Sequence, residues 1–353
     1  MTSTSSASST TAPVTTAPVT AAPVTAAPVT TAPVTAAPVT AAPVTAAPVT
    51  AAPVTAAASG RWTLGDLPVN RIGFGTMRLP QTGGALVPDA VPRDRDAALA
   101  VLRRAVDLGV NHIDTAAFYF SPLRSANELI NSALAPYADD LVITTKVGPA
   151  RDLTGRWAAH ARTPEALRGQ VEENLRQLGR DHLDVVNLRI VGTDSIAERF
   201  GALAELRQAG LIRHLGLSNV TPAHLAEAQA IAPVVCVQNR YGIGMRPEYD
   251  AFVQDCGAQG IASVPFYAIA AAGGERGATG AEPAEVLAVA EAHGVGPAEV
   301  RLAWTLHRGP HVLAIPGTGD LGHLAANVAA GALRLSEDEL ELLETVHRSA
   351  AAG

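Results

Sequence analysis

The amino-acid sequence predicts a (β/α)8 barrel, or TIM barrel, preceded by a disordered tail. Three observations lead to this prediction. Eight short apolar runs alternate with amphipathic helical stretches, which indicates parallel strands joined by crossover helices. Eight strands close a barrel, whereas an open doubly wound sheet has about five to seven. The 293 residues after position 60 also suit one barrel, which typically takes about 250 residues.

Residues 1–60 differ in composition from the rest of the chain. They contain no Asp, Glu, Lys, Arg or His, and residues 11–55 are nine tandem copies of the pentapeptide (Thr/Ala)-Ala-Pro-Val-Thr. A proline at every fifth position blocks helix formation, and without Leu, Ile or aromatic residues nothing offsets the entropy of ordering. We therefore predict a disordered low-complexity tail over residues 1–60. Two interpretations stay open: a spacer or glycosylated Thr/Pro stalk, or a repeat expansion or a start codon placed too far upstream.

Residues 61–353 carry all 33 acidic and 26 basic residues and are predicted to form the barrel. No run of about 18 apolar residues is present, which excludes a membrane-spanning helix, and the uncharged N-terminus does not resemble a secretory signal. A net charge of −7 without a basic stripe argues against nucleic-acid binding. Cys236 and Cys256 form no metal or redox motif. We expect a cytoplasmic protein without a metal site, of undetermined oligomeric state.

The apolar runs give eight predicted strands in chain order. They are Arg71–Gly75, His112–Asp114, Leu141–Lys146, Leu183–Arg189, Arg213–Leu217, Val234–Val237, Ile261–Val264 and Val312–Ile315. Helical patterns lie between them, among them Arg95–Leu108, Thr163–Leu178 and Ser195–Ala209. Thr163-Pro164 and Thr221-Pro222 are typical helix starts, and Gly109 and Gly210 are typical helix ends.

An open dinucleotide-binding sheet is the main alternative to the barrel. It needs a G-x-G-x-x-G loop that leads from the first strand directly into a helix. Here the first strand ends Gly73-Phe74-Gly75-Thr76-Met77-Arg78, and no helix is predicted before about Arg93. The sequence therefore disfavours this alternative.

Active groups of a barrel are expected at the C-terminal ends of its strands. Three predicted strands end in Asp114, Lys146 and Arg189. The other ends carry Gly75, Ser218-Asn219, Gln238-Asn239, Phe266 and Pro316-Gly317-Thr318. We expect Asp114 and Lys146 to pair, with Tyr119 folded over them. A cation beside a tyrosine lowers the pKa of its phenol, which would make Tyr119 a usable proton donor.

Several motifs resemble the aldo-keto reductases. They are Asp114-Thr115-Ala116-Ala117-Phe118-Tyr119, Thr144-Thr145-Lys146, the run from Gly210 to Ser218-Asn219, Val237-Gln238-Asn239, and Ile315-Pro316-Gly317-Thr318 with Asn327 downstream. The resemblance spans about residues 62–348, in the family's order and spacing. It implies a barrel that binds NADP(H) and reduces a small aldehyde or ketone to an alcohol. In that mechanism the cofactor supplies a hydride and a tyrosine protonates the carbonyl oxygen.

The resemblance also implies roles for individual residues. Tyr119 would be the general acid, Lys146 would lower its pKa and Asp114 would hold Lys146. Ser218, Asn219 and Gln238 would bind the nicotinamide carboxamide, and Phe266 would stack on the ring. The remaining expected cofactor-binding residues are Gly75, Thr76, Met77, Pro316, Gly317, Thr318, His323 and Asn327, the last three near the adenosine half, where a helix is predicted to start near Asp320.

Arg189 departs from the family, whose fourth catalytic residue is a histidine at this position. The strand Asp184-Val185-Val186-Asn187-Leu188-Arg189 resembles a bacterial subgroup of the family. A guanidinium stays protonated and presents a planar fork of donors, so it would polarise the substrate carbonyl or hold a carboxylate or phosphate. Pyridoxal is one substrate that would offer Arg189 a phenolate or phosphate. The alternative is a cofactor-binding regulatory or catalytically inactive homologue.

Three further features have open interpretations. Gly319-Asp320 places a carboxylate near the expected site of the cofactor's 2′-phosphate, which keeps NAD(H) open beside NADP(H). Phe118, Phe120 and Trp157 would form either an apolar substrate wall or packing within the loops. His112 lies on a buried strand and is interpreted as a packing residue rather than a ligand.

Overall fold

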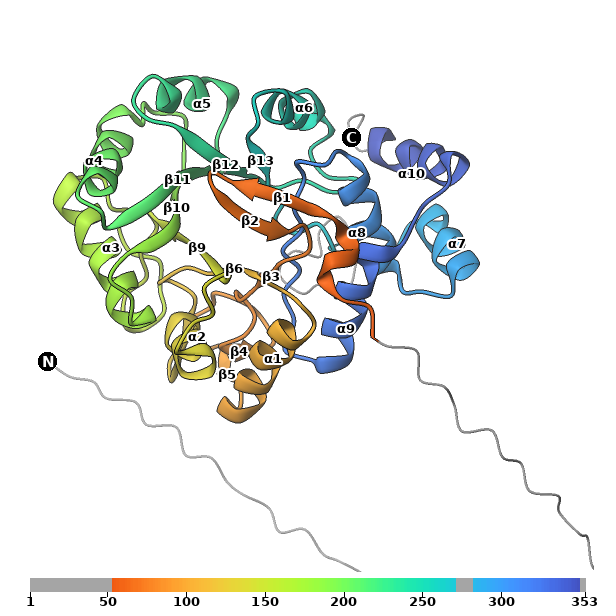
Figure 1. The fold of residues 1–353 in the computed structure, drawn as a ribbon, viewed down its shortest axis with the longest axis horizontal. Helices are drawn as coiled ribbons and strands as arrows, with labels where there is room; N and C mark the ends of the chain where they lie inside the picture. The colour runs from red at the N-terminus through yellow and green to blue at the C-terminus, as the bar shows by residue number, and fades with distance from the viewer. Residues whose placement is uncertain (1–52, 271–281, 350–353) are drawn as a thin grey trace, which may run out of the picture. The chain divides into compact units, whose positions relative to one another are not determined.

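The computed structural model describes residues 53–270 and 282–349. Seven parallel strands form one sheet in the order β13-β12-β11-β10-β9-β6-β3, seen at the centre of Figure 1. Their bounds are β3 (Phe74–Gly75), β6 (His112–Asp114), β9 (Val142–Val147), β10 (Leu183–Arg189), β11 (Ile212–Ser218), β12 (Val234–Gln238) and β13 (Ala262–Ser263). Each coincides with a predicted strand and extends at most one residue beyond it.

The eighth predicted strand, residues 312–315, closes the barrel through two isolated parallel bridges. Ala314 pairs with Ile72 beside β3, and Val312 pairs with Ser263 of β13. The N–H of Gly73 donates to the carbonyl of Ala314, and the N–H of Leu313 donates to the carbonyl of Ser263, both at 2.8 Å. Pro316 follows, and a proline has no N–H with which to extend the ladder. The predicted (β/α)8 fold is confirmed.

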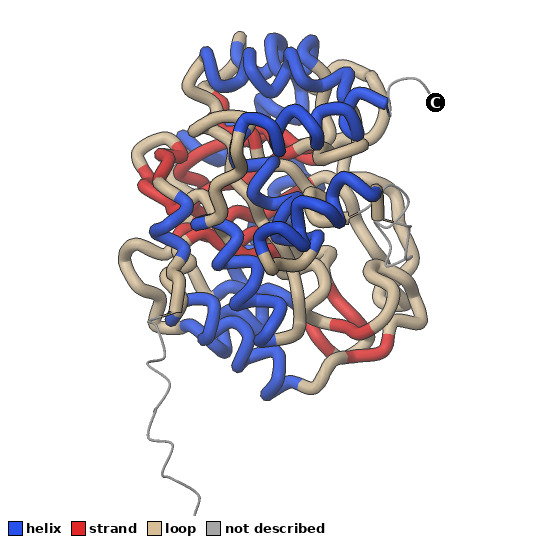
Figure 2. The backbone as a smooth tube through the Cα atoms, turned by 90° about the vertical axis from the view of Figure 1, so that its right-hand side faces the viewer, coloured by secondary structure: helices blue, strands red, loops and turns tan. Residues whose placement is uncertain are grey.

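Helices surround the strands, as the turned view in Figure 2 shows. Those of the barrel are α1 (Arg95–Asp107), α2 (Ala126–Leu134), α3 (Pro164–Leu178), α4 (Ala197–Gln208), α5 (Pro222–Gln229), α6 (Asp250–Ala258), α8 (Pro297–His307) and α9 (Leu321–Ala329), with α7 (Ala284–His293) and α10 (Glu337–Ser349) in addition. The hydroxyls of Thr163 and Thr221 cap α3 and α5, each followed by proline as predicted. None of the described helices is long and apolar enough to cross a membrane.

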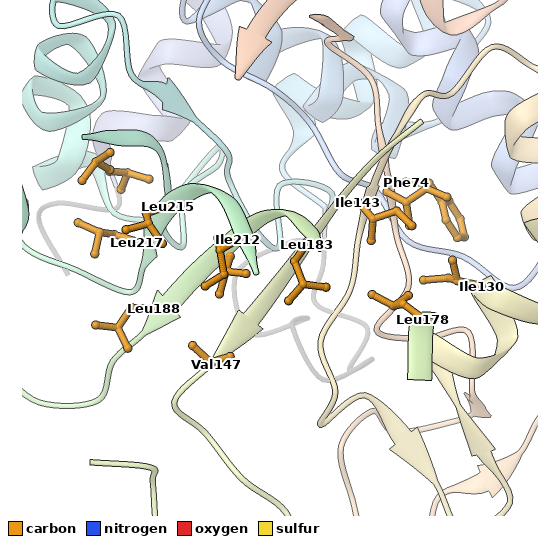
Figure 3. Close-up of a cluster of buried hydrophobic side chains, with 14 of the residues drawn as sticks. Phe74, Ile130, Ile143, Val147, Leu178, Leu183, Leu188, Ile212, Leu215 and Leu217 are labelled. Atoms are coloured by element: carbon orange, nitrogen blue, oxygen red, sulfur yellow. The ribbon is translucent and has the colours of Figure 1, made fainter. Parts of the chain in front are cut away.

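The largest apolar cluster fills the layer between the strands and the outer helices. Figure 3 shows part of it, where Phe74 and Ile143 of the sheet lie near Ile130 of α2 and Leu178 of α3. Each of these four side chains is at most 2% exposed. Burial of a side chain of this size contributes about 1.5–3 kcal/mol, so this layer holds the helices against the barrel.

A hairpin that the sequence analysis did not predict covers the N-terminal end of the barrel. Its strands are β1 (Arg61–Leu64) and β2 (Leu67–Asn70), and Figure 1 shows them crossing in front of the parallel strands. Leu64, Leu67 and Val69 join a cluster with Val142, Val185, Cys236, Ala262, Val264 and Leu313 from the barrel interior. The two-residue turn at Gly65, with φ of +67°, was a hairpin signal available in the sequence.

The packed part of the chain begins before residue 61. Residues 56–59 form a 3-10 helix in which Ala56 and Ser59 are buried. The N–H of Ala56 donates to the carbonyl of Leu108 at 2.8 Å, and the hydroxyl of Ser59 accepts from the N–H of Ile72 at 3.0 Å. The segment before the expected boundary at residue 60 is therefore packed against the barrel. Ala56 and Ser59 have small side chains, which lets their backbone lie close to residues 72 and 108. The predicted disorder of residues 1–52 lies outside the described residues.

Two short hairpins lie in the loops at the other end of the barrel. They are β4 (Gln81–Thr82) with β5 (Val91–Pro92), and β7 (Phe120–Ser121) with β8 (Arg124–Ser125). β7 begins directly after Tyr119, and β4 and β5 frame the loop that contains Val87. Both hairpins therefore lie near Tyr119 or Val87, in the loops at the C-terminal end of the barrel.

Candidate active site

Asp114, Lys146 and Gln238 meet inside the C-terminal end of the barrel. Successive side chains of a strand alternate between the barrel interior and its outside, which brings one residue from each of β6, β9 and β12 to the same place. Lys146 Nζ donates to Asp114 Oδ1 at 2.5 Å and to the carbonyl of Thr115 at 3.0 Å. Gln238 Nε2 donates to Asp114 Oδ2 at 2.7 Å. All three side chains are buried, and the ion pair expected from the sequence is present.

Tyr119 lies over this ion pair. The N–H of Tyr119 donates to the carbonyl of Ala116 at 2.9 Å, which turns the chain back after β6. Lys146 Nζ then lies 4.9 Å from the centroid of the tyrosine ring. Burial raises the pKa of the Tyr119 phenol above its ordinary value of 10, although Lys146 and Arg189 oppose the rise. The expected lowering of this pKa was therefore wrong, because burial outweighs the two cations.

A buried amide network supports the strands that carry Asp114 and Lys146. Thr115 Oγ1 donates to Asn127 Oδ1 at 2.7 Å, and Asn127 Nδ2 donates to Asn174 Oδ1 at 2.9 Å. The same oxygen accepts from Thr145 Oγ1 at 2.6 Å. The network thus ties α2 and α3 to the residues beside Asp114 and Lys146. This network was not predicted from the sequence, although asparagines on the buried faces of amphipathic helices were a usable signal.

Arg189 is the last residue of β10, and only one nitrogen of its guanidinium donates a hydrogen bond to a described residue. Its Nη1 donates to Ser218 Oγ at 3.1 Å, and its Cζ lies 4.8 Å from the centroid of the Phe266 ring. Its hydrogen-bond partner among the described residues is a neutral hydroxyl, not a carboxylate. Arg189 therefore touches two of the expected nicotinamide-binding residues and keeps donors for a further group.

Ser218, Asn219 and Gln238 form one edge of the site at the ends of β11 and β12. The N–H of Asn219 donates to the carbonyl of Gln238 at 3.0 Å, and Asn219 Nδ2 donates to the carbonyl of Ile190 at 2.9 Å. Asn219 has a φ of +60°, which asparagine tolerates better than most residues. Gln238 Oε1 is buried and accepts no hydrogen bond from the described residues. An amide oxygen of this kind can accept hydrogen bonds from N–H donors.

The Gly75-Thr76-Met77 and Pro316-Gly317-Thr318 segments lie side by side. The N–H of Gly75 donates to the carbonyl of Pro316 at 3.1 Å, and the N–H of Thr76 donates to the carbonyl of Asp114 at 2.9 Å. A Cβ at Gly317 would collide with the carbonyl oxygen of Gly75, so this close approach needs glycine. Met77 packs against the cluster that contains Tyr119.

The predicted helix start near Asp320 is confirmed, and Asp320 itself caps α9. Its Oδ1 accepts from the N–H of His323 at 2.8 Å, and its own N–H donates to Thr318 Oγ1 at 3.1 Å. The hydrogen bond from His323 lowers the pKa of the Asp320 carboxyl. His323 is exposed and Asn327 is buried on the same helix. No hydrogen bond between described residues joins these two to the Asp114 and Lys146 pair.

Arg93 reaches this loop from a distant part of the chain. Its Nη1 donates to the carbonyl of Gly319 at 3.3 Å, and its Nη2 donates to the carbonyl of Gln81 at 3.3 Å. A Cβ at Gly319 would collide with the guanidinium. Arg93 and Gly319 are 226 residues apart in the sequence, so no local motif signals their contact.

His112 lies below the ion pair, inside the barrel. Its Nε2 is 3.1 Å from Thr144 Oγ1. Burial lowers the pKa of His112 to about 4, with Asp114 opposing and Lys146 adding to the effect. The side chain is therefore neutral at ordinary pH and packs within the barrel, in agreement with its interpretation as a packing residue.

Comparisons with known proteins agree with this arrangement. The model of the aldo/keto reductase family matches residues 71–348. The chain is 44% identical over 298 residues to the pyridoxine 4-dehydrogenase of Escherichia coli, and the alignment covers 82% of this chain and 99% of the relative. It is 29% identical to the methylglyoxal reductase YeaE of the same organism, with 80% of this chain and 93% of the relative covered. An aldo/keto reductase of Klebsiella pneumoniae, solved in complex with NADP and acetate, superposes with a TM-score of 0.64 at 27% identity (79% and 92%). The chain belongs to the aldo/keto reductase family.

Proposed function

We propose that this oxidoreductase uses NADP(H) to reduce a small aldehyde to an alcohol, with Tyr119 as the proton donor. The observation that carries the proposal is the buried Asp114–Lys146 pair beneath the Tyr119 ring. Burial keeps the phenol protonated at neutral pH, since it raises the pKa of Tyr119. The proton is therefore available to a carbonyl oxygen that approaches the barrel mouth.

Lys146 and Asp114 act on the proton transfer through charge. As Tyr119 releases its proton, the ammonium of Lys146 stabilises the tyrosinate that forms. Asp114 accepts a hydrogen bond from this ammonium and holds it in place, and the pairing offsets the cost of burying the two charges. When bound, NADPH supplies the hydride.

The residues at the barrel mouth fit a nicotinamide cofactor. The Gln238 Oε1, which has no hydrogen-bond partner among the described residues, suits the N–H of a carboxamide, and Phe266 is the residue proposed to stack on the nicotinamide ring. The remaining proposed contacts of the cofactor are Gly75, Thr76, Met77, Pro316, Gly317, Thr318, His323 and Asn327. The carboxylate of Asp320 is engaged in capping α9, and the guanidinium of Arg93 lies beside Gly319. This arrangement favours the 2′-phosphate of NADP(H) over NAD(H).

We propose pyridoxal, which is reduced to pyridoxine, as a substrate of this site. One relative, 44% identical, is named a pyridoxine 4-dehydrogenase. The aldehyde of pyridoxal stands next to a phenolic oxygen on the same ring. Arg189 keeps unused donors beside Ser218 and Phe266, and it would donate to this oxygen while the aldehyde meets Tyr119.

The proposal is tested by following NADPH absorbance with the purified chain and pyridoxal, methylglyoxal and a panel of other aldehydes. We expect turnover with pyridoxal. Tyr119→Phe should lower kcat by about 100- to 10,000-fold, the usual contribution of a general acid, with an unchanged Kd for NADPH. Tight NADPH binding without turnover of any aldehyde would instead indicate a regulatory or inactive homologue.

A further inference from the structure

The backbone on both sides of Tyr119 is held by a single side chain from another loop. Tyr119 lies in the connection between β6 and β7. The carbonyl oxygens of its two neighbours, Phe118 and Phe120, both accept from Nη1 of Arg151, at 3.2 and 2.7 Å. We propose that Arg151 is a positioning residue that orients Tyr119 for proton transfer. The inference rests on the proposed role of Tyr119 as the proton donor.

The other donors of Arg151 join two more segments to this loop. Its Nε donates to the carbonyl of Gly155 at 2.9 Å, and its Nη2 donates to the carbonyl of Val87 at 3.3 Å. One guanidinium thus connects the loop after β6, the loop after β9 and the β4–β5 loop. Gly155 has a φ of +80°, and a Cβ there would lie 2.8 Å from Nη2, so glycine leaves the room that the arginine occupies.

Aromatic rings pack around Arg151 and Tyr119. The Cζ of Arg151 lies 4.5 Å from the centroid of the Phe120 ring. On the other side of Tyr119, the Phe118 ring packs nearly perpendicular to the tyrosine at a centroid distance of 5.0 Å, and Trp157 lies 5.9 Å from Phe118. The Phe118 ring therefore packs against the tyrosine, and the Phe120 ring packs against Arg151.

The guanidinium of Arg151 bonds to backbone carbonyls, not to a carboxylate of the described residues. A partly buried guanidinium is tolerated when its donors are satisfied, and only arginine presents donors in a planar fork. A lysine has one nitrogen and cannot reach carbonyls in three separate segments. The side chain therefore acts through geometry.

The geometry of Tyr119 matters because proton transfer depends on short distances. A misplacement of about 1 Å costs about 100-fold in rate. A looser loop would also move the phenol away from Lys146, whose ammonium lies 4.9 Å from the ring centroid. Without that cation the pKa of Tyr119 rises further, since Lys146 is one of the groups that lower it.

The first test compares kinetics of Arg151→Lys and Arg151→Ala with Arg156→Ala, a control in the same loop whose side chain is exposed. We expect kcat to fall about 100-fold in Arg151→Ala and about tenfold in Arg151→Lys, with the Kd for NADPH unchanged. The alkaline limb of the kcat profile for reduction should shift to higher pH in Arg151→Lys. A lower melting temperature with unchanged kcat and an unmoved pH profile would overturn the proposal.

The second test does not depend on activity. The chain contains five tyrosines, so 3-fluorotyrosine labelling gives five fluorine NMR resonances, and Tyr119→Phe identifies that of Tyr119. We expect Arg151→Lys to shift this resonance and Arg156→Ala to leave it in place. An unmoved resonance contradicts the positioning role. A shifted resonance in a chain that turns over no aldehyde would retain the role of Arg151 and contradict the proposed function instead.

Discussion

At its N-terminal end the barrel is filled by Leu64, Leu67 and Val69 of the hairpin, packed against apolar side chains of the strands. At its C-terminal end the same strands present Asp114, Lys146 and Gln238, joined by short hydrogen bonds. Apolar burial stabilises the fold, whereas buried charges cost free energy of desolvation that their pairing only offsets. The apolar packing that stabilises the fold and the polar groups of the site therefore lie at opposite ends of the barrel, so substitutions should affect stability and activity separately.

The largest expected effect is on stability, at the hairpin end. Leu64 is fully buried, and Leu64→Ala should lower the free energy of unfolding by about 2–5 kcal/mol because it removes packing and leaves a cavity. Denaturant unfolding measures this, with the exposed Leu153→Ala as control, expected to change stability by less than about 0.5 kcal/mol. The kcat of the folded variant should stay unchanged. A loss of kcat without a loss of stability would break the separation of the two ends.

A smaller effect is expected from His112, which lies between the ends. Its pKa is lowered from 6.5 to about 4 in the folded chain, so the unfolded chain binds more protons between these values. Stability is therefore fully present above pH 6.5 and falls as the pH drops towards 4, by up to about 3 kcal/mol. Unfolding free energies of the wild type and His112→Asn across this range measure the difference. Parallel pH dependences in the two chains would contradict the assignment.

The smallest expected effect is on catalysis alone, at Arg189. Arg189→Ala should lower kcat/KM for pyridoxal by at least about tenfold, or about 1.4 kcal/mol. The free energy of unfolding should hardly change, because Arg189 donates to Ser218 and pairs with no described carboxylate. Arg189→Lys is the matched variant, which keeps the charge and loses the planar fork. Unchanged steady-state kinetics in Arg189→Ala would show that this guanidinium takes no part in the reaction.

The site was predictable where its residues follow strands. Asp114, Lys146, Arg189 and Gln238 each come at the end of an apolar run, so the barrel topology alone brings them together. Arg93 and Arg151 were not predicted, because they donate to backbone carbonyls of loops. Every residue has such a carbonyl, so the sequence does not show which ones an arginine will contact. The direction of the pKa shift of Tyr119 was also missed. It depends on how completely the ring is buried, which a motif does not state.

The strand positions, the closed barrel and the family were predictable from the sequence, since they follow from apolar periodicity and from residues spaced along single segments. How the loops are held is visible only in the folded chain. The tertiary structure placed Arg151 on the carbonyls beside Tyr119 and Arg93 on Gly319, and it packed Ala56 and Ser59 against the barrel. Periodicity reports which face of an element is buried. Contacts between distant loops depend on distances that only the folded chain sets.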